Sequence, residues 1–423
     1  MSNQLPSTLV ESIKSWTSAH REWFVSLTSE LVRAPSINAP PTGGEKTVQQ
    51  LIGHWFGQLG IEASLYELGE ISGLQEHVAW RPGRNYGGRP NLVARLKGNG
   101  EGRSLVLSGH ADTVGLADEA WLHPPFAADC DGERIYGLGA FDMKGGLASA
   151  MLAARCLQDL NISLAGDLYV ESVVDEEFGG ANGTLAGRLR HPRIDGAIIM
   201  EPTNLRLATS HRGVVVLRLE VLGKPGRSFS GEEVVNPAKI LARMIQDLEE
   251  FNRRRNASRH QYGLADTLGL EIDQLRAGPV DEMLGTRVPS VAWATFWLDL
   301  DPDQDPSAPV DALASLLTQR YDPTQFRLTS VIPALWGSRI PDEHPLVKTV
   351  STSLQLAEVN PLPITAPFAC DGAMFNRHSR TPMLILGPEG GNAHAADEFV
   401  SVSSLQTLTA VLALATIDWC GMA

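Results

Sequence analysis

The chain has 423 residues, of which 43% are hydrophobic and 20% are charged, and its formal net charge is −14. This composition is that of a folded protein, and the length favours two domains, because one hydrophobic core rarely serves so many residues. The negative charge argues against nucleic-acid binding, which needs a surplus of lysine and arginine. The first ten residues lack a secretory signal pattern, and we interpret the apolar runs elsewhere as too short to span a bilayer. We therefore expect a cytoplasmic protein that binds neither nucleic acid nor membrane.

The first half of the chain alternates apolar runs with helical patterns. A helix is predicted from Thr8, and a second helix is predicted from Thr47 to Leu59. Strand-like runs follow at residues 105–107, 168–174 and 197–200, with a helix over residues 147–157. Residues 81–90, which are rich in Gly, Arg and Pro, are predicted to form a surface loop. The alternation predicts an α/β catalytic domain with a largely parallel central sheet that is flanked by helices.

The pattern changes after residue 213. Residues 214–221 and 291–300 alternate as half-exposed strands, and residues 236–255 form an amphipathic helical pattern. These elements predict a small α+β domain with one covered sheet face. A helix over residues 345–358, a strand over 383–386 and a helix over 403–419 then resume the α/β pattern. We therefore predict a catalytic domain of residues 1–212 and 330–423, interrupted by an inserted domain of residues 213–329.

Two tryptophans share one face of the predicted strand 291–300. Trp293 and Trp297 lie on the same side because side chains alternate along a strand. We favour the interpretation that the helices of the inserted domain cover both rings. If the rings are exposed instead, they indicate a contact between subunits.

Side chains that can bind metals or transfer protons follow four of the predicted strands. They are His110, Asp112, Glu176, Glu177, Glu201 and His394. Ligands of open α/β sheets bind beyond the carboxyl ends of the strands, so we expect these side chains to converge. Imidazoles combined with carboxylates suit Zn²⁺, Mn²⁺ or Co²⁺. The sequence therefore predicts a metal site at this edge of the sheet.

Asp142 is the candidate to bridge two metal ions, because it lies in a glycine-rich turn that leads into a helix. A bridging carboxylate, with one histidine and one further carboxylate on each ion, would make a symmetric site that can share a hydroxide. Asp112 is suited to accept the second imidazole N–H of His110 and to fix the ring. Each residue alone is more often a turn residue, a helix cap or a solvent-exposed carboxylate. The combination of so many ligand-type residues at strand ends argues against these ordinary roles for all of them.

Five ordered motifs surround these residues, at 108–114, 137–146, 175–180, 201–203 and 393–398. They closely resemble the motifs of the M20 metallopeptidase family, which includes acetylornithine deacetylase, succinyl-diaminopimelate desuccinylase, aminoacylase and glutamate carboxypeptidase. By this resemblance the ligands of one metal ion are His110, Asp142 and Glu201, and those of the other are Asp142, Glu177 and His394.

The resemblance also implies a general base and an oligomer. Glu176 corresponds to the base that takes a proton from water and returns it to the leaving nitrogen. The inserted domain of this family commonly dimerises and closes over the site. We therefore expect two divalent ions per subunit and a homodimer or higher homo-oligomer.

The inserted domain departs from the family pattern at positions that face the substrate. Arg227 stands where relatives usually have a histidine, Arg287 lies in a motif that usually begins with asparagine, and Asp301 replaces an arginine that binds a substrate carboxylate. Arg227 and Arg287 are therefore the candidates to bind such a carboxylate, since a guanidinium can hold it through two parallel hydrogen bonds.

The predicted function is the metal-dependent hydrolysis of an amide C–N bond in a small molecule that carries a carboxylate. One alternative is an aminohydrolase that replaces an aromatic amine by hydroxide, as in the related nitroanthranilate aminohydrolase. Another alternative is a catalytically silent metal-binding assembly protein. The presence of Glu176 together with every metal ligand argues against this second alternative.

Overall fold

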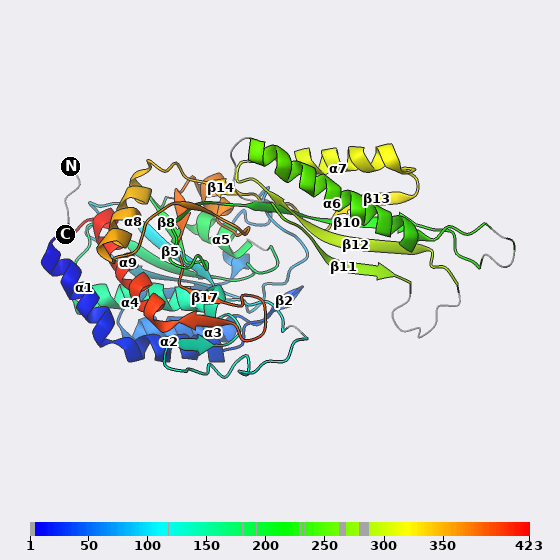
Figure 1. Cartoon of the computed structure of the whole chain (residues 1–423). Coiled ribbons are helices and arrows are strands. Elements are labelled where there is room, and N and C mark those ends of the chain that lie inside the picture. Colours follow the sequence, from blue (N-terminus) through cyan, green and yellow to red (C-terminus); the bar gives the residue numbers. More distant parts are fainter. Residues whose placement is uncertain are drawn as a thin grey trace. The chain divides into compact units, whose positions relative to one another are not determined.

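The computed structural model describes residues 5–116, 118–179, 182–191, 193–227, 231, 233–261, 268–278 and 287–423. The chain forms two compact units. The core unit comprises Met1–Ser210, Arg339–Ala366 and Asp371–Ala423, and the inserted unit comprises His211–Ser338 and Pro367–Cys370. Blue and red ribbons both occur in the core unit in Figure 1, because the first and last parts of the chain build it together.

A mixed sheet lies at the centre of the core unit. Its main path runs in the order β14 (Ser338–Arg339), β9 (Ala208–His211), β16 (Met383–Ile385), β8 (Ala197–Ile199), β5 (Leu105–His110), β7 (Leu168–Val173), β4 (Asn91–Leu96) and β3 (Glu62–Tyr66), and β15 (Ile364–Ala366) pairs with β9. Strands β16, β8, β5 and β7 are parallel. Strand β9 is antiparallel to β16, and β4 is antiparallel to both β7 and β3. The α/β class is confirmed, but antiparallel strands flank the four parallel ones, so the sheet is mixed.

Seven helices of the described residues belong to the core unit. They are α1 (Ser7–Ala19), α2 (Arg21–Arg33), α3 (Lys46–Gln58), α4 (Gly145–Asp159), α5 (Asn182–Arg190), α8 (Pro345–Leu356) and α9 (Val402–Cys420). The predicted helices are confirmed within a few residues, but α2 was not predicted. Phe24, Leu27 and Leu31 of α2 are buried at helical spacing. The backbone leaves the helical conformation at His20, so two helices replace one.

The apolar helix α9 corrects one expectation from the sequence. Its 19 residues have a mean hydropathy of 1.2, and by length and composition alone the helix could cross a membrane. The expectation that every apolar run is too short for this was therefore wrong. In the structure α9 contacts α1, α4 and α8, and 78% of its most apolar stretch is buried inside the protein. The apolar composition is that of a helix in a protein core.

Short elements complete the core unit. Strands β1 (Asn38–Ala39) and β2 (Thr42–Gly43) form a small hairpin, while β17 (Gly390–Gly391), β18 (Phe399–Ser401) and β6 (Arg134–Tyr136) form a second small sheet. The short helices are η1 (Leu68–Glu70), η2 (Ala140–Lys144) and η4 (Phe375–Ser379). Pairing of β18 with β6 brings the segment after His394 beside the segment before Asp142.

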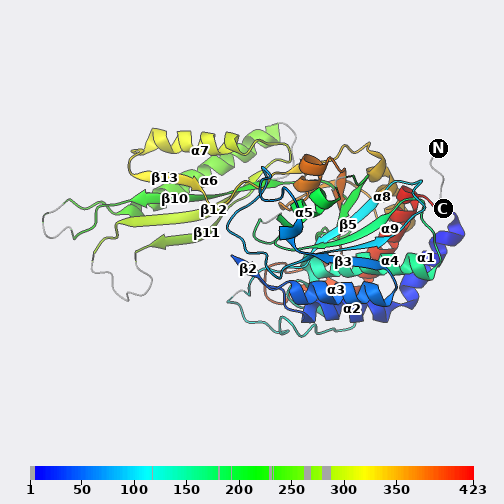
Figure 2. The ribbon, with the colours of Figure 1, turned by 180° about the vertical axis from the view of Figure 1, so that it is seen from behind.

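The inserted unit is a sheet covered on one face by helices. Its described residues form four antiparallel strands in the order β11 (Leu270–Ala277), β12 (Val291–Leu300), β10 (Gly213–Leu222) and β13 (Phe326–Ser330). Helices α6 (Pro237–Gln261) and α7 (Ser307–Arg320) lie over the same face of this sheet in Figures 1 and 2. Their apolar side chains share one core with Leu217, Phe296 and Leu298.

The two tryptophans of β12 lie on the other face. The even-numbered residues Ala292, Ala294 and Phe296 belong to the core under the helices. Trp297 is 37% exposed, and Trp293 lies beneath the guanidinium group of Arg218, 3.9 Å from its ring centre. Our favoured interpretation, that the helices cover both rings, is therefore wrong.

Candidate metal centre

The predicted ligands lie beyond the carboxyl ends of the parallel strands. His110 is the last residue of β5, Glu177 follows β7, and Glu201 follows β8. Strand β5 pairs in parallel with both β7 and β8, so these three ends meet at one edge of the sheet. The loop that carries His394 follows β16, the parallel neighbour of β8.

Asp142 reaches the same edge from the turn before α4. Gly139 has a φ of +80°, a left-handed conformation that glycine adopts without strain. Gly146 allows the first turn of α4 to pack against the chain after β8, because a Cβ there would collide with the carbonyl oxygen of Met200. The predicted glycine-rich turn into a helix is confirmed. Its glycines let Asp142 approach the residue that follows Met200, which is Glu201.

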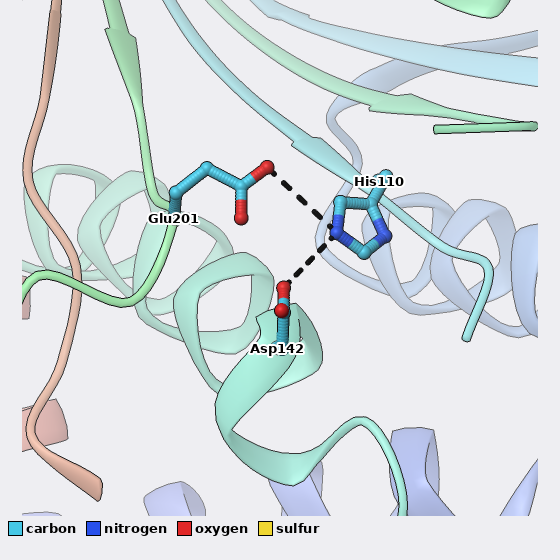
Figure 3. A group of neighbouring side chains, drawn as sticks. All are labelled: His110, Asp142 and Glu201. Atoms are coloured by element: carbon cyan, nitrogen blue, oxygen red, sulfur yellow. Dashed lines mark hydrogen bonds and ion pairs between the residues drawn. The ribbon is translucent and has the colours of Figure 1, made fainter. Parts of the chain in front are cut away.

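The first ligand group consists of His110, Asp142 and Glu201. Figure 3 shows the three side chains pointing toward one another, with Nε2 of His110 facing both carboxylates. This nitrogen lies 3.2 Å from Oδ1 of Asp142 and 3.8 Å from Oε1 of Glu201. One ligand atom from each residue lies within 4.8 Å of the others. One imidazole and two carboxylates at this spacing fit a divalent cation of the zinc type.

The second ligand group consists of Asp142, Glu177 and His394. Nε2 of His394 lies 3.3 Å from Oδ2 of Asp142 and 3.0 Å from Oε2 of Glu177. The two oxygens of Asp142 therefore face different groups, Oδ1 toward His110 and Oδ2 toward His394. Oε1 of Glu177 is buried and has no hydrogen-bond partner among the described residues. A buried carboxylate oxygen without a donor is what a cation would satisfy.

The two ligand groups together hold three carboxylates, and this negative charge requires cations or protons nearby. Burial raises the pKa of Glu201 well above its usual range, and the negative charge of Asp142 raises it further. Burial alone would lower the pKa of His394, but the hydrogen bonds that its imidazole donates to Asp142 and Glu177 raise it to about 11. In the metal-free protein, protons on the imidazoles therefore offset the negative charge. Metal ions would replace these protons, since a ligating imidazole is neutral.

Asp112 supports His110 in a different way from the one we predicted. Nδ1 of His110 lies 2.9 Å from the backbone carbonyl oxygen of Asp112, whereas the carboxylate oxygen Oδ1 is 3.7 Å away. The carboxylate instead accepts hydrogen bonds from the backbone N–H groups of Glu176 and Glu177, at 3.2 and 3.0 Å. The prediction that this carboxylate fixes the imidazole is wrong. It holds the backbone of the two glutamates.

Glu176 lies beside the first ligand group. Its Oε1 accepts a hydrogen bond of 3.2 Å from the backbone N–H of Asp371, and Glu176, Glu201 and Asp371 have carboxylate oxygens within 4.8 Å of one another. Burial raises the pKa of Glu176 well above its usual range; the charge of His110 opposes this, and that of Asp371 adds to it. A buried carboxyl group with a raised pKa can both accept and return a proton near neutral pH.

Residues that the sequence analysis missed hold the segment before Glu176. Tyr86 donates a hydrogen bond to Asp175, and Nη1 of Arg84 lies 3.5 Å from Oδ1 of the same carboxylate. Arg89 is 2% exposed and pairs with Glu45, with its Nε 2.8 Å from Oε2. Residues 81–90 form an irregular loop that is partly exposed, as we predicted, but Tyr86 and Arg89 are buried. They form an internal brace beside the centre.

The two arginines proposed for substrate binding lie in the inserted unit, and both have exposed side chains. Asp301, which stands in place of the usual arginine, forms an ion pair with Arg259. Asp299 pairs with Arg212 at 3.0 Å. The contribution of Arg227 and Arg287 to substrate binding stays a prediction.

A mixed α/β sheet with two groups of imidazole and carboxylate ligands at its strand ends is the arrangement of a metal-dependent hydrolase. The model of Peptidase family M20/M25/M40 matches residues 106–418. The chain belongs to this family, and it is a metal-dependent hydrolase that acts on amide or peptide C–N bonds.

Known relatives extend over nearly the whole chain. An acetylornithine deacetylase from Erwinia tasmaniensis is 27% identical over 409 residues, which are 94% of this chain and 98% of the relative. Human carnosine dipeptidase 1 superposes with a TM-score of 0.72 at 16% identity, covering 97% of this chain and 99% of that chain. A dinuclear metal-binding peptidase of family M20 from Bacillus subtilis superposes with a TM-score of 0.63 at 14% identity, over 95% and 99% of the two chains. These structures show that the fold is shared.

Proposed function

We propose that the chain binds two divalent ions, Zn²⁺, Mn²⁺ or Co²⁺, one in each ligand group. The observation that carries this proposal is the split carboxylate of Asp142, whose two oxygens face the two imidazoles. The buried Oε1 of Glu177 supports it, because this atom has no donor among the described residues. When bound, the ions would activate water and polarise a carbonyl group.

We infer that Glu176 is the general base. Its carboxylate is held at the edge of the first ligand group by the backbone N–H of Asp371. From there it can accept a proton from water and return this proton to the leaving nitrogen. Asp112 assists indirectly, since its carboxylate fixes the backbone of Glu176 and Glu177.

The proposed reaction is the deacylation of a small amide that carries a carboxylate. The similarity to acetylornithine deacetylase supports this reaction type over the release of an aromatic amine. Arg227 and Arg287 would bind the substrate carboxylate, because the strand-end position is Asp301 and this carboxylate is paired with Arg259. A guanidinium group binds a carboxylate through two parallel hydrogen bonds.

We propose that the chain works as a homodimer or higher homo-oligomer through the inserted unit. The partly exposed rings of Trp293 and Trp297 support this, since aromatic side chains are enriched in subunit interfaces. A cytoplasmic location, and the lack of nucleic-acid and membrane partners, stay predictions.

A substrate panel tests the proposed reaction. The purified chain is loaded with Zn²⁺ or Mn²⁺ and incubated with N-acetylated amino acids, formamides and aminobenzoates, and released amines and ammonia are measured. We expect turnover of an N-acyl amino acid that is absent from a matched Glu176→Gln preparation. Ammonia from an aminobenzoate would favour the aminohydrolase alternative. A metal-loaded chain that turns over no amide would contradict the proposal.

A further inference from the structure

The buried carboxylate of Glu398 binds the backbone of the turn that carries Asp142. Glu398 is 1% exposed. Its Oε1 accepts hydrogen bonds from the backbone N–H groups of Phe141 and Asp142, at 2.8 and 2.9 Å, and its Oε2 accepts one from Gly139 at 2.9 Å. One carboxylate thus satisfies three donors of a turn that is not a regular helix.

Glu398 also belongs to the segment that carries His394. Its backbone carbonyl oxygen accepts a hydrogen bond of 2.8 Å from the N–H of Gly137. Directly after it, β18 pairs with β6, which precedes Gly137. Side chain and backbone of this one residue therefore tie two ligand-bearing segments together. These are the segments whose ligands, Asp142 and His394, come within 3.3 Å of each other.

We propose that Glu398 is a positioning residue of the metal centre, which holds Asp142 at the distance from His394 that the second ion requires. The proposal rests on the proposed two-ion site. Glu398 binds the backbone of Asp142 and of its neighbours in the turn, and its carboxylate oxygens accept from these three donors. The effect of removing it should therefore fall on ion binding and on the geometry of the bound ion.

The neighbouring residue provides a matched control. Asp397 is also a carboxylate of the same segment, and its Oδ1 accepts hydrogen bonds of 2.9 Å from the N–H groups of Leu122 and His123. These donors belong to a loop that carries none of the five ligands. If Glu398 merely stabilised its segment, changes at both positions should have similar consequences. If it positions Asp142, only the change at Glu398 should alter ion binding.

The test compares Glu398→Gln with Asp397→Asn. Glutamine places an NH₂ group against at least one backbone N–H of the turn, so at least one hydrogen bond is lost. We expect the dissociation constant of one bound ion to rise about 10- to 100-fold, as for other residues that support metal ligands. Zn²⁺ and Co²⁺ are titrated against a competing chelator, and the visible spectrum of the Co²⁺ form is recorded. Asp397→Asn should match the wild type in both measurements.

Two outcomes would overturn the proposal. The first is a folded Glu398→Gln variant with wild-type ion affinities and an unchanged Co²⁺ spectrum. The second is rapid hydrogen exchange of the Phe141 and Asp142 amides in the metal-free wild type. This result would show that Glu398 does not hold the turn, and it can be obtained even if the variant does not fold. If the wild type itself binds no pair of ions, the proposed function fails instead, and the titration of the wild type shows this separately.

Discussion

Replacing Asp142 with alanine should remove both metal ions, because each oxygen of this carboxylate faces a different ligand group. Oδ1 lies 3.2 Å from Nε2 of His110, and Oδ2 lies 3.3 Å from Nε2 of His394. The variant leaves His110 with Glu201 in one group and Glu177 with His394 in the other. Each ion would lose one ligand and one negative charge.

The size of the effect follows from that lost charge. A divalent ion and a unit charge at about 4 Å interact by about 8 kcal/mol when the effective dielectric constant is about 20, and we take about half of this as lost because water replaces the carboxylate. Since about 1.4 kcal/mol corresponds to a factor of ten, each dissociation constant should rise by roughly three orders of magnitude. Ions that bind in the nanomolar range would then bind in the micromolar range and be lost on dialysis.

The assay is elemental analysis after dialysis, with circular dichroism to confirm folding. Glu177→Ala and Glu201→Ala are the matched controls, because each of these residues belongs to a single ligand group. Each control should lose one ion and retain the other. An Asp142→Ala variant that keeps one ion with wild-type affinity would refute the shared carboxylate.

Three further predictions concern the base, the imidazole and the substrate. Glu176→Gln should lower kcat by roughly two to four orders of magnitude with unchanged metal content, since the amide cannot accept a proton; near-normal turnover would move the base elsewhere. In the metal-free protein the pKa of His394 is raised from 6.5 to about 11. Protonated His394 therefore adds to the free energy of unfolding in full below about pH 6.5, and this contribution is lost as the pH rises toward 11. Urea unfolding of His394→Ala should therefore depend less steeply on pH across this range, and equal slopes would contradict the assignment. Arg227→Lys or Arg287→Lys should raise KM with metal content intact, and unchanged kinetics of both would exclude them from substrate binding.

The proposed metal ligands could be located from the sequence because most of them lie at or after strand ends. The apolar runs of β5, β8 and β16 are short and buried, and polar residues at or just beyond their carboxyl ends lie where ligands of such sheets bind. Asp142 was predictable for a related reason, since glycines such as Gly139 and Gly146 mark a tight turn into a helix. These patterns are local, so they can be recognised in the sequence without knowledge of the fold.

The brace around Asp175 could not be predicted in this way. Residues 81–90 have the polar and glycine-rich composition of an exposed loop, and only pairing with distant residues buries Tyr86 and Arg89. Arg89 meets Glu45 and Tyr86 meets Asp175, each far away along the chain. Burial of such charges depends on partners that the local pattern does not reveal.

The prediction that helices cover Trp293 and Trp297 was wrong for a different physical reason. Alternation along β12 correctly places Trp293 and Trp297 on one side, but it does not say which side the helices cover. The covered side carries Ala292 and Ala294, whose small side chains allow the helices to pack closely. The face that carries the tryptophans is therefore the one opposite the helices.

The position of β16 has a consequence for synthesis on the ribosome. This strand comes from residues 383–385, yet it lies between β8 and β9, which are made much earlier. Until it emerges, β8 has an open edge in the middle of the future sheet, and open edges invite wrong pairing. The strands of the inserted unit are all translated before β16. The antiparallel sheet of the inserted unit can therefore form while the core unit still lacks β16 and α9.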